Sequence, residues 1–228
     1  MQADIIVVAA GKGERMGREL PKPFLPVDGL PLLIHTLRAI TQSSLIANII
    51  LVVAPEREAL CHDILRVHGR FHVPLTVVHG GAERQDSVRL GLAALDTTSE
   101  IVAIHDAARP FLDREILERS IETAALHGAA LVAVPARDTI KRVGEDGTVL
   151  ETLPRHHLWL AQTPQTFRVA LIREAHAWAL AEGVVVTDDA ALLEHWGHVV
   201  KIVPGSYRNF KITTPEDLLV AEALLRMG

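Results

Sequence analysis

Near its N-terminus the chain reads Ile5-Ile6-Val7-Val8-Ala9-Ala10-Gly11-Lys12-Gly13-Glu14-Arg15-Met16-Gly17. An apolar strand therefore leads directly into a turn that is rich in glycine and basic residues. In α/β proteins such turns present backbone N–H groups to ligands, and phosphate is the usual ligand. The cations Lys12, Arg15, Arg18 and Lys22 add to those donors. A plain turn with solvated charges would not need this many cations, so the segment predicts a polyphosphate site.

Two common phosphate-binding loops do not match this segment. The dinucleotide pattern G-x-G-x-x-G fails because Gly17 comes one residue too late after Gly13. The Walker A pattern fails because Met16 takes its second glycine position, and no Lys-Ser or Lys-Thr pair follows. These mismatches argue against a hydride-transfer enzyme and against a P-loop ATPase.

Composition indicates a globular protein without a membrane span. Hydrophobic residues make up 49% of the 228 residues and charged residues 22%, which is ordinary for such proteins. The longest apolar runs, 5–10 and 49–55, are far shorter than the roughly 18 residues that a span needs. The N-terminal residues carry no basic region or cleavage site, so we expect no signal peptide.

Net charge and cysteine content limit the functions and the cellular location that this protein can have. A net charge of −5 argues against a nucleic-acid binder, whereas a small anionic substrate needs only local positive charge. The single cysteine, Cys61, excludes an intrachain disulfide and favours a reducing, cytoplasmic location. The 12 histidines include no pair at the spacing of a zinc protease motif, so no metal-ligating residues are predicted.

The rest of the chain alternates apolar strands with amphipathic helices. This order predicts a single α/β domain over residues 1–228, with a mainly parallel sheet between layers of helices. The predicted strands are 4–10, 47–54, 75–79, 101–105, 130–135 and 199–203. The predicted helices are 32–41, 56–68, 86–95, 114–127, 168–181, 188–195 and one that begins at the N-cap Thr214.

Residues 137–159 interrupt this alternation. Two strand-like segments flank the turn Gly144-Glu145-Asp146-Gly147, and an Asp-Gly turn between alternating strands predicts a hairpin. Such a hairpin is either a solvated excursion or an arm that packs on a second subunit. We favour the arm. The segments Arg137-Asp138-Thr139, Pro154-Arg155 and Thr163-Pro164-Gln165 are expected to flank it or belong to it.

Polar residues also gather where other strands end, which is where ligands bind in open α/β sheets. In Gly80-Gly81-Ala82-Glu83-Arg84-Gln85-Asp86-Ser87 the glycines allow close backbone approach, and Ser87 either reaches a nucleotide or, like Asp86, caps a helix. In His105-Asp106-Ala107-Ala108-Arg109 an acid and a cation follow a buried strand. Asp106 and Arg109 either bind a ligand or form a salt bridge with each other. Thr187-Asp188 either caps a helix or binds a ligand. Lys211 is expected to be a surface lysine unless the fold returns it to the site.

Taken in order, these segments resemble the 2-C-methyl-D-erythritol 4-phosphate cytidylyltransferase family over essentially the whole chain. The first motif alone would indicate only a nucleotidyltransferase, whereas the ordered set is specific to this family and its pentitol-phosphate relatives. The matching motifs are Ala9-Ala10-Gly11-x-Gly13-x-Arg15-Met16, Pro21-Lys22, Gly80-Gly81-x-x-Arg84-x-x-Ser87-Val88, His105-Asp106-Ala107-Ala108-Arg109-Pro110, Asp138-Thr139-x-Lys141, Thr163-Pro164-Gln165, Thr187-Asp188 and Asn209-x-Lys211-x-Thr213-x-Pro215-Glu216-Asp217.

The resemblance implies a Rossmann-like nucleotidyltransferase sandwich, a homodimer with interlocked arms, and Mg²⁺ carried by the phosphates of CTP. It implies that Arg15 and Lys22 stabilise the transition state at the α-phosphorus. It further implies that Arg155 of the other subunit and Lys211 hold the methylerythritol phosphate. The implied acceptor-pocket residues are Asp106, Arg109, Thr139, Thr163 and Thr187. The implied CTP-binding residues are Ala9, Ala10, Gly11, Gly13, Gly81, Arg84, Ser87 and Ala107.

The chemistry of the implied reaction agrees with the residues that the sequence provides. A phosphate monoester is already an anionic nucleophile, so the catalyst must overcome repulsion between two anions and align them. Cations suffice for that task, and no nucleophile–base pair is needed. The alternatives are a cytidylyltransferase for ribitol phosphate or another polyol phosphate, and a non-catalytic nucleotide sensor. A sensor would not need the transition-state cations Arg15 and Lys22.

Overall fold

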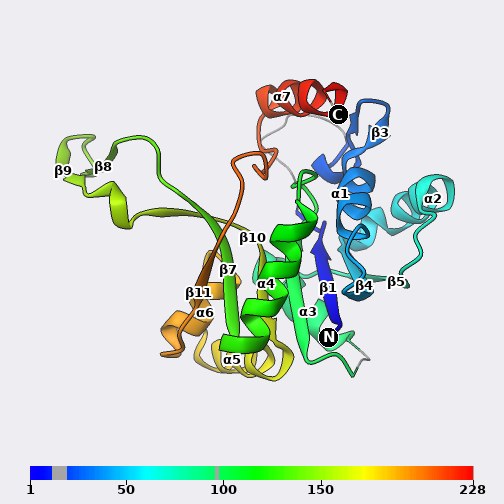
Figure 1. The fold of residues 1–228 in the computed structure, drawn as a ribbon, viewed down its shortest axis with the longest axis horizontal. Helices are drawn as coiled ribbons and strands as arrows, with labels where there is room; N and C mark the ends of the chain where they lie inside the picture. The colour runs from blue at the N-terminus through cyan, green and yellow to red at the C-terminus, as the bar shows by residue number, and fades with distance from the viewer. Residues whose placement is uncertain (12–19, 96–97, 228) are drawn as a thin grey trace.

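The computed structural model describes residues 1–11, 20–95 and 98–227 of the chain. Its centre is a seven-stranded sheet in the order β11-β7-β10-β6-β1-β4-β5 (Figure 1). The strands are β1 (Ala3–Val8), β4 (Ile46–Val53), β5 (Leu75–His79), β6 (Ile101–Asp106), β7 (Ala129–Pro135), β10 (Trp159–Arg168) and β11 (Lys201–Pro204). Neighbouring strands are parallel except at β10, which is antiparallel to both β6 and β7. The predicted mainly parallel α/β sandwich is confirmed.

Helices cover both faces of this sheet, because the central strands are apolar on both faces. Ile5 and Val7 of β1 pack in one hydrophobic cluster, and Ile6 packs in another on the opposite face. The first cluster is covered by α1 (Leu32–Ile40), α2 (Glu58–His68) and α4 (Arg114–His127). The second is covered by α3 (Arg84–Ala93), α5 (Val169–Glu182) and α6 (Asp189–His195). Cys61 is fully buried in the first cluster.

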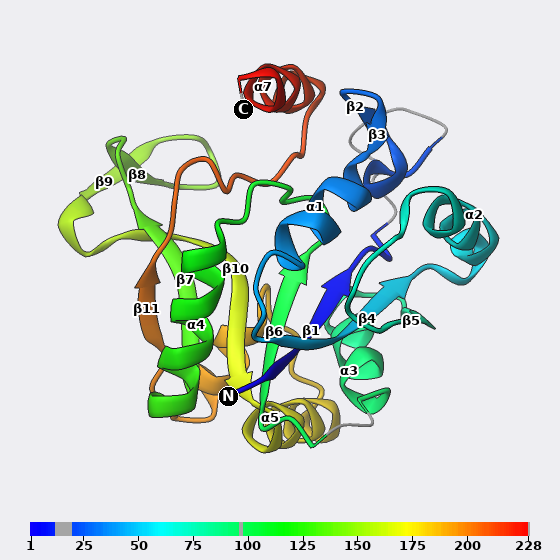
Figure 2. The same cartoon turned by 45° about the vertical axis from the view of Figure 1, so that its right-hand side comes forward.

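A third apolar cluster lies beyond the carboxyl ends of the central strands. There α7 (Pro215–Arg226) packs against the small hairpin of β2 (Pro26–Val27) and β3 (Leu30–Pro31), as Figures 1 and 2 show. Val27 and Leu218 belong to this cluster together with Ala108, which follows β6. The predicted start of α7 is confirmed, since Thr214 and Asp217 form a reciprocal capping box. This cluster holds the β2–β3 hairpin and the C-terminal helix α7 beside the edge of the sheet where ligands are expected.

The predicted hairpin is present and protrudes from the body of the molecule (Figure 1). Its strands are β8 (Ile140–Val143) and β9 (Val149–Leu153), and they pair antiparallel to each other. The N–H of Gly147 donates to the carbonyl of Gly144 across the predicted turn. A 3₁₀ turn, η4 (Arg155–His157), connects the hairpin to β10.

Thr163-Pro164-Gln165, expected either to flank the arm or to belong to it, does not belong to the arm but follows it directly in the chain. These residues lie in β10, between β6 and β7 in the middle of the sheet. Proline cannot donate to a strand ladder and is rare in central strands. The ladder accommodates it with a register shift between Ala161 and Gln165. As a result, Thr163 lies next to the carboxyl end of β6.

The chain order in the sheet places the ligand-binding edge between β1 and β6. From β1 the chain moves outward to β4 and β5, and then returns to the other side of β1 at β6. Ligands in open α/β sheets bind at such a reversal of strand order, outside the carboxyl ends of the strands. Across the described residues, no helix is both long enough and apolar enough to cross a bilayer.

Candidate active site

The turns that follow β1 and β5 meet at this edge. The N–H of Ala9 donates to the carbonyl of Val52, and that of Gly80 to Val53, both at 2.8 Å. A Cβ atom on Gly80 would lie only 2.5 Å from the Cβ of Ala10 and 2.7 Å from the Oγ of Ser87. Only glycine allows the two turns to approach so closely. The two segments predicted to bind the nucleotide are therefore neighbours in space.

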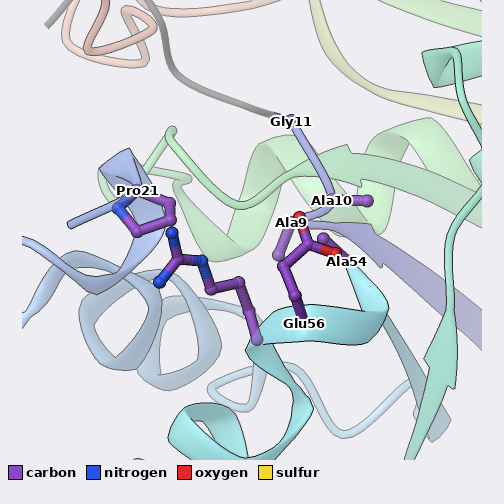
Figure 3. Close-up of a pocket in the computed structure, with 7 residues that line it drawn as sticks. Ala9, Ala10, Gly11, Pro21, Ala54 and Glu56 are labelled. Carbon is purple, nitrogen blue, oxygen red and sulfur yellow. The ribbon is translucent and has the colours of Figure 1, made fainter. Parts of the chain in front are cut away.

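A pocket opens beside the turn after β1. It is lined by Ala9, Ala10, Gly11, Pro21, Ala54, Glu56 and Arg57. In Figure 3, Pro21 lies across the pocket from Ala9 and Ala10. The next residue, Lys22, begins the 3₁₀ turn η2 (Lys22–Phe24), and the buried Phe24 ties that turn to the first cluster. The basic residue of the Pro21-Lys22 motif thus lies next to the glycine turn.

Ser87 anchors the second of these turns. Its side chain is 2% exposed, and its Oγ accepts from the N–H of Gly81 at 3.2 Å and donates to the carbonyl of Glu83 at 3.1 Å. Asp86 accepts from the N–H of Glu83 at 3.4 Å, as part of a capping box at the start of α3. In this structure the Ser87 hydroxyl therefore shapes the loop. Its contact with a nucleotide stays a prediction.

A second pocket lies at the end of β6, and Asp106 is at its centre. One oxygen of Asp106, Oδ2, lies 3.0 Å from Lys211 Nζ and 3.5 Å from Arg109 Nε. The other oxygen, Oδ1, lies 3.5 Å from Arg84 Nε. The lining residues are Arg84, Asp106, Arg109, Ala161, Gln162, Thr163, Gln165, Thr187, Asp188 and Lys211. Lys211 is therefore returned to the site by the fold, and the expected Asp106–Arg109 salt bridge is one of three ion pairs.

The three cations determine the charge state of Asp106. Burial alone would raise the pKa of this carboxyl, but Lys211, Arg84 and Arg109 outweigh burial and hold the pKa well below its usual range. Burial also lowers the pKa of Arg109, against the raising effect of Asp106. The pocket thus contains an ionised carboxylate with three cations around it, which suits an anionic ligand that also carries hydroxyl groups.

A buried hydrogen-bond chain supports the turn after β6. The Oγ1 of Thr163 accepts from the N–H of Asp106 at 3.1 Å and lies 2.9 Å from Nδ1 of His105. The Nε2 of His105 lies 3.1 Å from the carbonyl of Arg109. Because a carbonyl only accepts, Nε2 carries the proton, and Nδ1 accepts from the Thr163 hydroxyl. Burial lowers the pKa of His105 to about 4, which agrees with this neutral tautomer.

Asn209 supports the same turn from the other side. Its carbonyl accepts from Arg109 Nη1 at 2.8 Å, and its side-chain Nδ2 donates to the carbonyl of Thr163 at 2.8 Å. Both residues are thereby fixed relative to the segment that carries Lys211. The cations of the pocket are held by buried partners and do not need to be ordered by the ligand.

The comparisons with known proteins identify the family. The model of the family described as 2-C-methyl-D-erythritol 4-phosphate cytidylyltransferase matches residues 3–227. The chain belongs to this family. A relative with that name from Geotalea uraniireducens is 49% identical, and the match covers 99% of this chain and 97% of the relative. Another from Pelotomaculum thermopropionicum is 48% identical, with 97% and 93% covered.

A solved structure gives the same result for the fold. The 4-diphosphocytidyl-2C-methyl-D-erythritol synthase of Anaerococcus prevotii superposes with a TM-score of 0.88 at 35% identity, covering 99% of this chain and 96% of that one. The resemblance to this cytidylyltransferase family, inferred from motifs alone, is therefore confirmed, and so is the nucleotidyltransferase fold.

The structure gathers most of the residues expected for a cytidylyltransferase site. Ala9, Ala10 and Gly11 line the first pocket, and the loop containing Gly81 and Ser87 lies beside them. The second pocket contains Asp106, Arg109, Thr163, Thr187, Lys211 and also Arg84, which the resemblance had placed with CTP. Ala107 is buried directly after β6, and its N–H donates to the carbonyl of Val8. Gly13 and Arg15 lie outside the described residues.

Two predicted acceptor residues are not brought to the pocket of their own chain. Thr139 is exposed at the start of the arm, and Arg155 lies on η4, where its Nη1 donates to the carbonyl of Arg137. Neither lines the pocket around Asp106. Their roles stay predictions that depend on a second subunit.

Two buried groups around the cytidylyltransferase pocket were not predicted. His105 belongs to a matching motif without a predicted role, and Asp189 belongs to none of the predicted site segments. Asp189 is 1% exposed and pairs with Arg84 Nη1 at 2.7 Å through Oδ2. Its spacing to Leu192 and Leu193 places it on the apolar face of α6, which is unusual for a carboxylate. That pattern could have identified it.

Proposed function

We propose that this chain transfers CMP from CTP to 2-C-methyl-D-erythritol 4-phosphate and releases pyrophosphate. The acceptor phosphate attacks the α-phosphorus of CTP in line with the departing pyrophosphate, so one P–O bond forms as another breaks. The observation that carries this proposal is the pocket around Asp106, which adjoins the glycine turns and contains Arg84, Arg109 and Lys211. Family membership supports both substrates.

The cations have distinct tasks in this proposal. Arg15 and Lys22 stabilise the charge that develops around the α-phosphorus, where a preorganised cation is worth about 3 kcal/mol. Lys211 holds the acceptor phosphate, and Asp106 accepts from the acceptor's hydroxyl groups. Neighbouring cations keep Asp106 ionised, so it can act as an acceptor at neutral pH.

The nucleotide binds at the first pocket and the adjacent loop. Its phosphates face the backbone of Ala9, Ala10, Gly11 and Gly13, while the base lies toward Gly81 and Ser87. The close approach of Gly80 to Ala10 supports one continuous nucleotide site across the two turns. Ala107, at the end of β6, borders that site on the acceptor side.

We propose that CTP binds as its Mg²⁺ complex, with the phosphates as metal ligands. Among the described residues, no three His, Cys, Asp or Glu side chains lie together as a metal site, and both oxygens of Asp106 contact cations. This donor set fits an ion that the nucleotide supplies. When bound, the ion screens the charge of the triphosphate.

The arm supports a homodimer. Its strands and the start of β10 expose large apolar side chains, which is costly for a solvated hairpin. These residues are Val143, Val149, Leu150, Trp159 and Leu160. A second copy that covers them could bring its Arg155 to the acceptor pocket. The free, buried thiol of Cys61 supports a cytoplasmic location for this dimer.

The experiment that tests the function is pyrophosphate release with each of CTP, UTP, ATP and GTP in the presence of Mg²⁺. Methylerythritol phosphate and ribitol phosphate are offered side by side as acceptors. We expect release with CTP and methylerythritol phosphate to exceed every other combination. Equal turnover with all four nucleotides, or none with any, would reject the proposal, and a preference for ribitol phosphate would reassign the acceptor.

A further inference from the structure

Arg84 joins two carboxylates that come from different parts of the fold. Its Nε lies 3.5 Å from Oδ1 of Asp106 at the end of β6, and its Nη1 lies 2.7 Å from Oδ2 of Asp189 at the start of α6. The contact with Asp189 is short, whereas the contact with Asp106 is long. The guanidinium is therefore held mainly by Asp189, and it reaches Asp106 with one nitrogen.

Asp189 is built into a rigid corner. Its side chain is 1% exposed, and its Oδ1 lies 3.6 Å from Nε2 of the buried His176 on α5. Burial would raise the pKa of Asp189, but Arg84 and His176 outweigh burial and lower it. An ionised carboxylate in such surroundings is costly unless a fixed cation faces it.

Side-chain amides lock this corner to the neighbouring elements. Gln85 on α3 donates to the carbonyl of Val184 at 2.9 Å and accepts from the N–H of Val186 at 3.1 Å. Gln165 on β10 accepts from the N–H of Ala190 at 2.9 Å. The start of α6 is therefore fixed to α3 and to β10, so Asp189 presents its carboxylate to Arg84 from a constant position.

We propose that Asp189 is a positioning residue for acceptor binding, which acts through Arg84 on Asp106. A carboxylate has about four lone-pair positions. Asp106 contacts Lys211, Arg109 and one nitrogen of Arg84, so it retains capacity to accept from an acceptor hydroxyl. Without Asp189, the guanidinium is free to turn and pair with Asp106 through two nitrogens, which is its preferred geometry. That pairing would occupy the oxygens that the hydroxyl groups need.

Electrostatics alone makes the opposite prediction. The pocket contains the charges of Arg84, Arg109 and Lys211 against those of Asp106, Asp188 and the adjoining Asp189. Asp189→Asn adds one net positive charge next to a site for an anion, and by charge alone it should tighten acceptor binding. Positioning instead predicts weaker binding. The sign of the change therefore separates the two explanations.

The inference rests on the proposed function, and steady-state pyrophosphate release tests it. In Asp189→Asn we expect the KM for methylerythritol phosphate to rise roughly tenfold or more, the loss typical of a charge-assisted contact. The KM for CTP should change less than about twofold. Asp189→Glu keeps the charge and should recover part of the acceptor KM. Asp63→Asn is the matched control, because its pair with Arg66 at 3.0 Å is exposed on α2.

A double-variant cycle with Asp106→Asn tests the route of the effect. If Asp189 acts through Asp106, Asp189→Asn should change kcat/KM for the acceptor much less in that background, because contacting residues are not additive. Additive losses would overturn the inference, and so would an unchanged or lower acceptor KM in Asp189→Asn. The inference would also be overturned if only the KM for CTP rose, because Arg84 would then serve nucleotide binding. If Asp189→Asn does not fold, Arg84→Lys decides, because lysine keeps the charge but cannot bridge both carboxylates as the guanidinium does. An unchanged acceptor KM in Arg84→Lys would reject positioning through Arg84. An inactive wild-type enzyme would instead reject the proposed function.

Discussion

The hydroxyl of Thr163 lies 2.9 Å from Nδ1 of His105 in the interior of the protein. Thr163 belongs to the antiparallel strand β10, and His105 to the parallel strand β6. The chain continues from His105 Nε2 to the carbonyl of Arg109, so one imidazole connects a pocket-lining threonine to the turn that carries two pocket charges. A neutral imidazole is the form that can accept at one nitrogen and donate at the other.

His105→Leu should therefore weaken both the fold and the acceptor site. The variant leaves the Thr163 hydroxyl and the Arg109 carbonyl buried without His105 as their partner, which costs about 1–3 kcal/mol for each group. His105→Gln should lose less, because its amide can still donate toward Arg109. Urea unfolding measures the stability, and acceptor titrations measure the KM. Equal stability of wild type and His105→Leu would contradict this role.

The same histidine predicts a pH dependence of stability. In the unfolded chain His105 has its ordinary pKa of 6.5, and in the folded chain burial lowers the pKa to about 4. Between these values the unfolded state binds more protons, so stability must fall as the pH falls. The contribution is complete above pH 6.5 and amounts to about 3 kcal/mol. Asp106 and Asp189 also reduce the stability as they become protonated, but only below the ordinary aspartate pKa of 3.8.

Urea unfolding of wild type and His105→Gln between pH 7 and pH 4 checks this expectation. The wild type should lose stability steadily across that range, and His105→Gln should have a flatter profile. His127→Gln is the control, because His127 is exposed at the end of α4. Parallel profiles for wild type and His105→Gln would show that folding does not lower the pKa of His105.

Local pattern predicted the parallel half of the fold well, because periodicity and capping are local properties. The strand Leu75–His79 and the helix Arg114–His127 have the predicted bounds. The pattern failed at β10, where Pro164 and polar neighbours do not look like a central strand. What makes that segment a strand is the space between β6 and β7, which no local window contains.

Some features of the candidate site could be predicted from local sequence, and others could not. The glycines of the nucleotide turns could be predicted, since close backbone approach requires that residue type. The ion pair of Arg84 with Asp189 could not, because its members are more than a hundred residues apart and Asp189 follows a capping residue, Asp188. A second acid at a helix start is ordinarily explained by the helix dipole. The spacing to Leu192 and Leu193 indicates that Asp189 is buried, but only the folded structure shows that its partner is Arg84.

Lys22→Ala and Arg15→Ala should each lower kcat by roughly 100-fold or more, as the loss of a transition-state cation does. The KM for CTP should rise less, because backbone donors share the ground-state contacts. Steady-state kinetics with both substrates saturating measures the effect. Arg66→Ala, which removes an exposed arginine of α2, should keep full activity. A near-wild-type kcat in either variant would remove that residue from the proposed machinery.

Arg155 gives the most demanding test of the dimer. It lies on the exposed arm and donates to the carbonyl of Arg137, so within its own chain it has no reason to affect catalysis. In a dimer that buries Trp159 and Leu160 it could complete the acceptor pocket of the neighbouring subunit. We expect Arg155→Ala to raise the acceptor KM or lower kcat while CTP affinity stays nearly unchanged.

Complementation then decides which subunit Arg155 serves. Mixed dimers of Arg155→Ala and Lys22→Ala subunits contain one site in which both residues are intact, provided that the arm crosses to the partner. Some activity should return on mixing, whereas each variant alone stays impaired. Subunit exchange is verified with differently tagged chains. If exchanged dimers recover no activity, Arg155 acts in its own subunit or in no site, because only a crossed arrangement brings the two wild-type residues together.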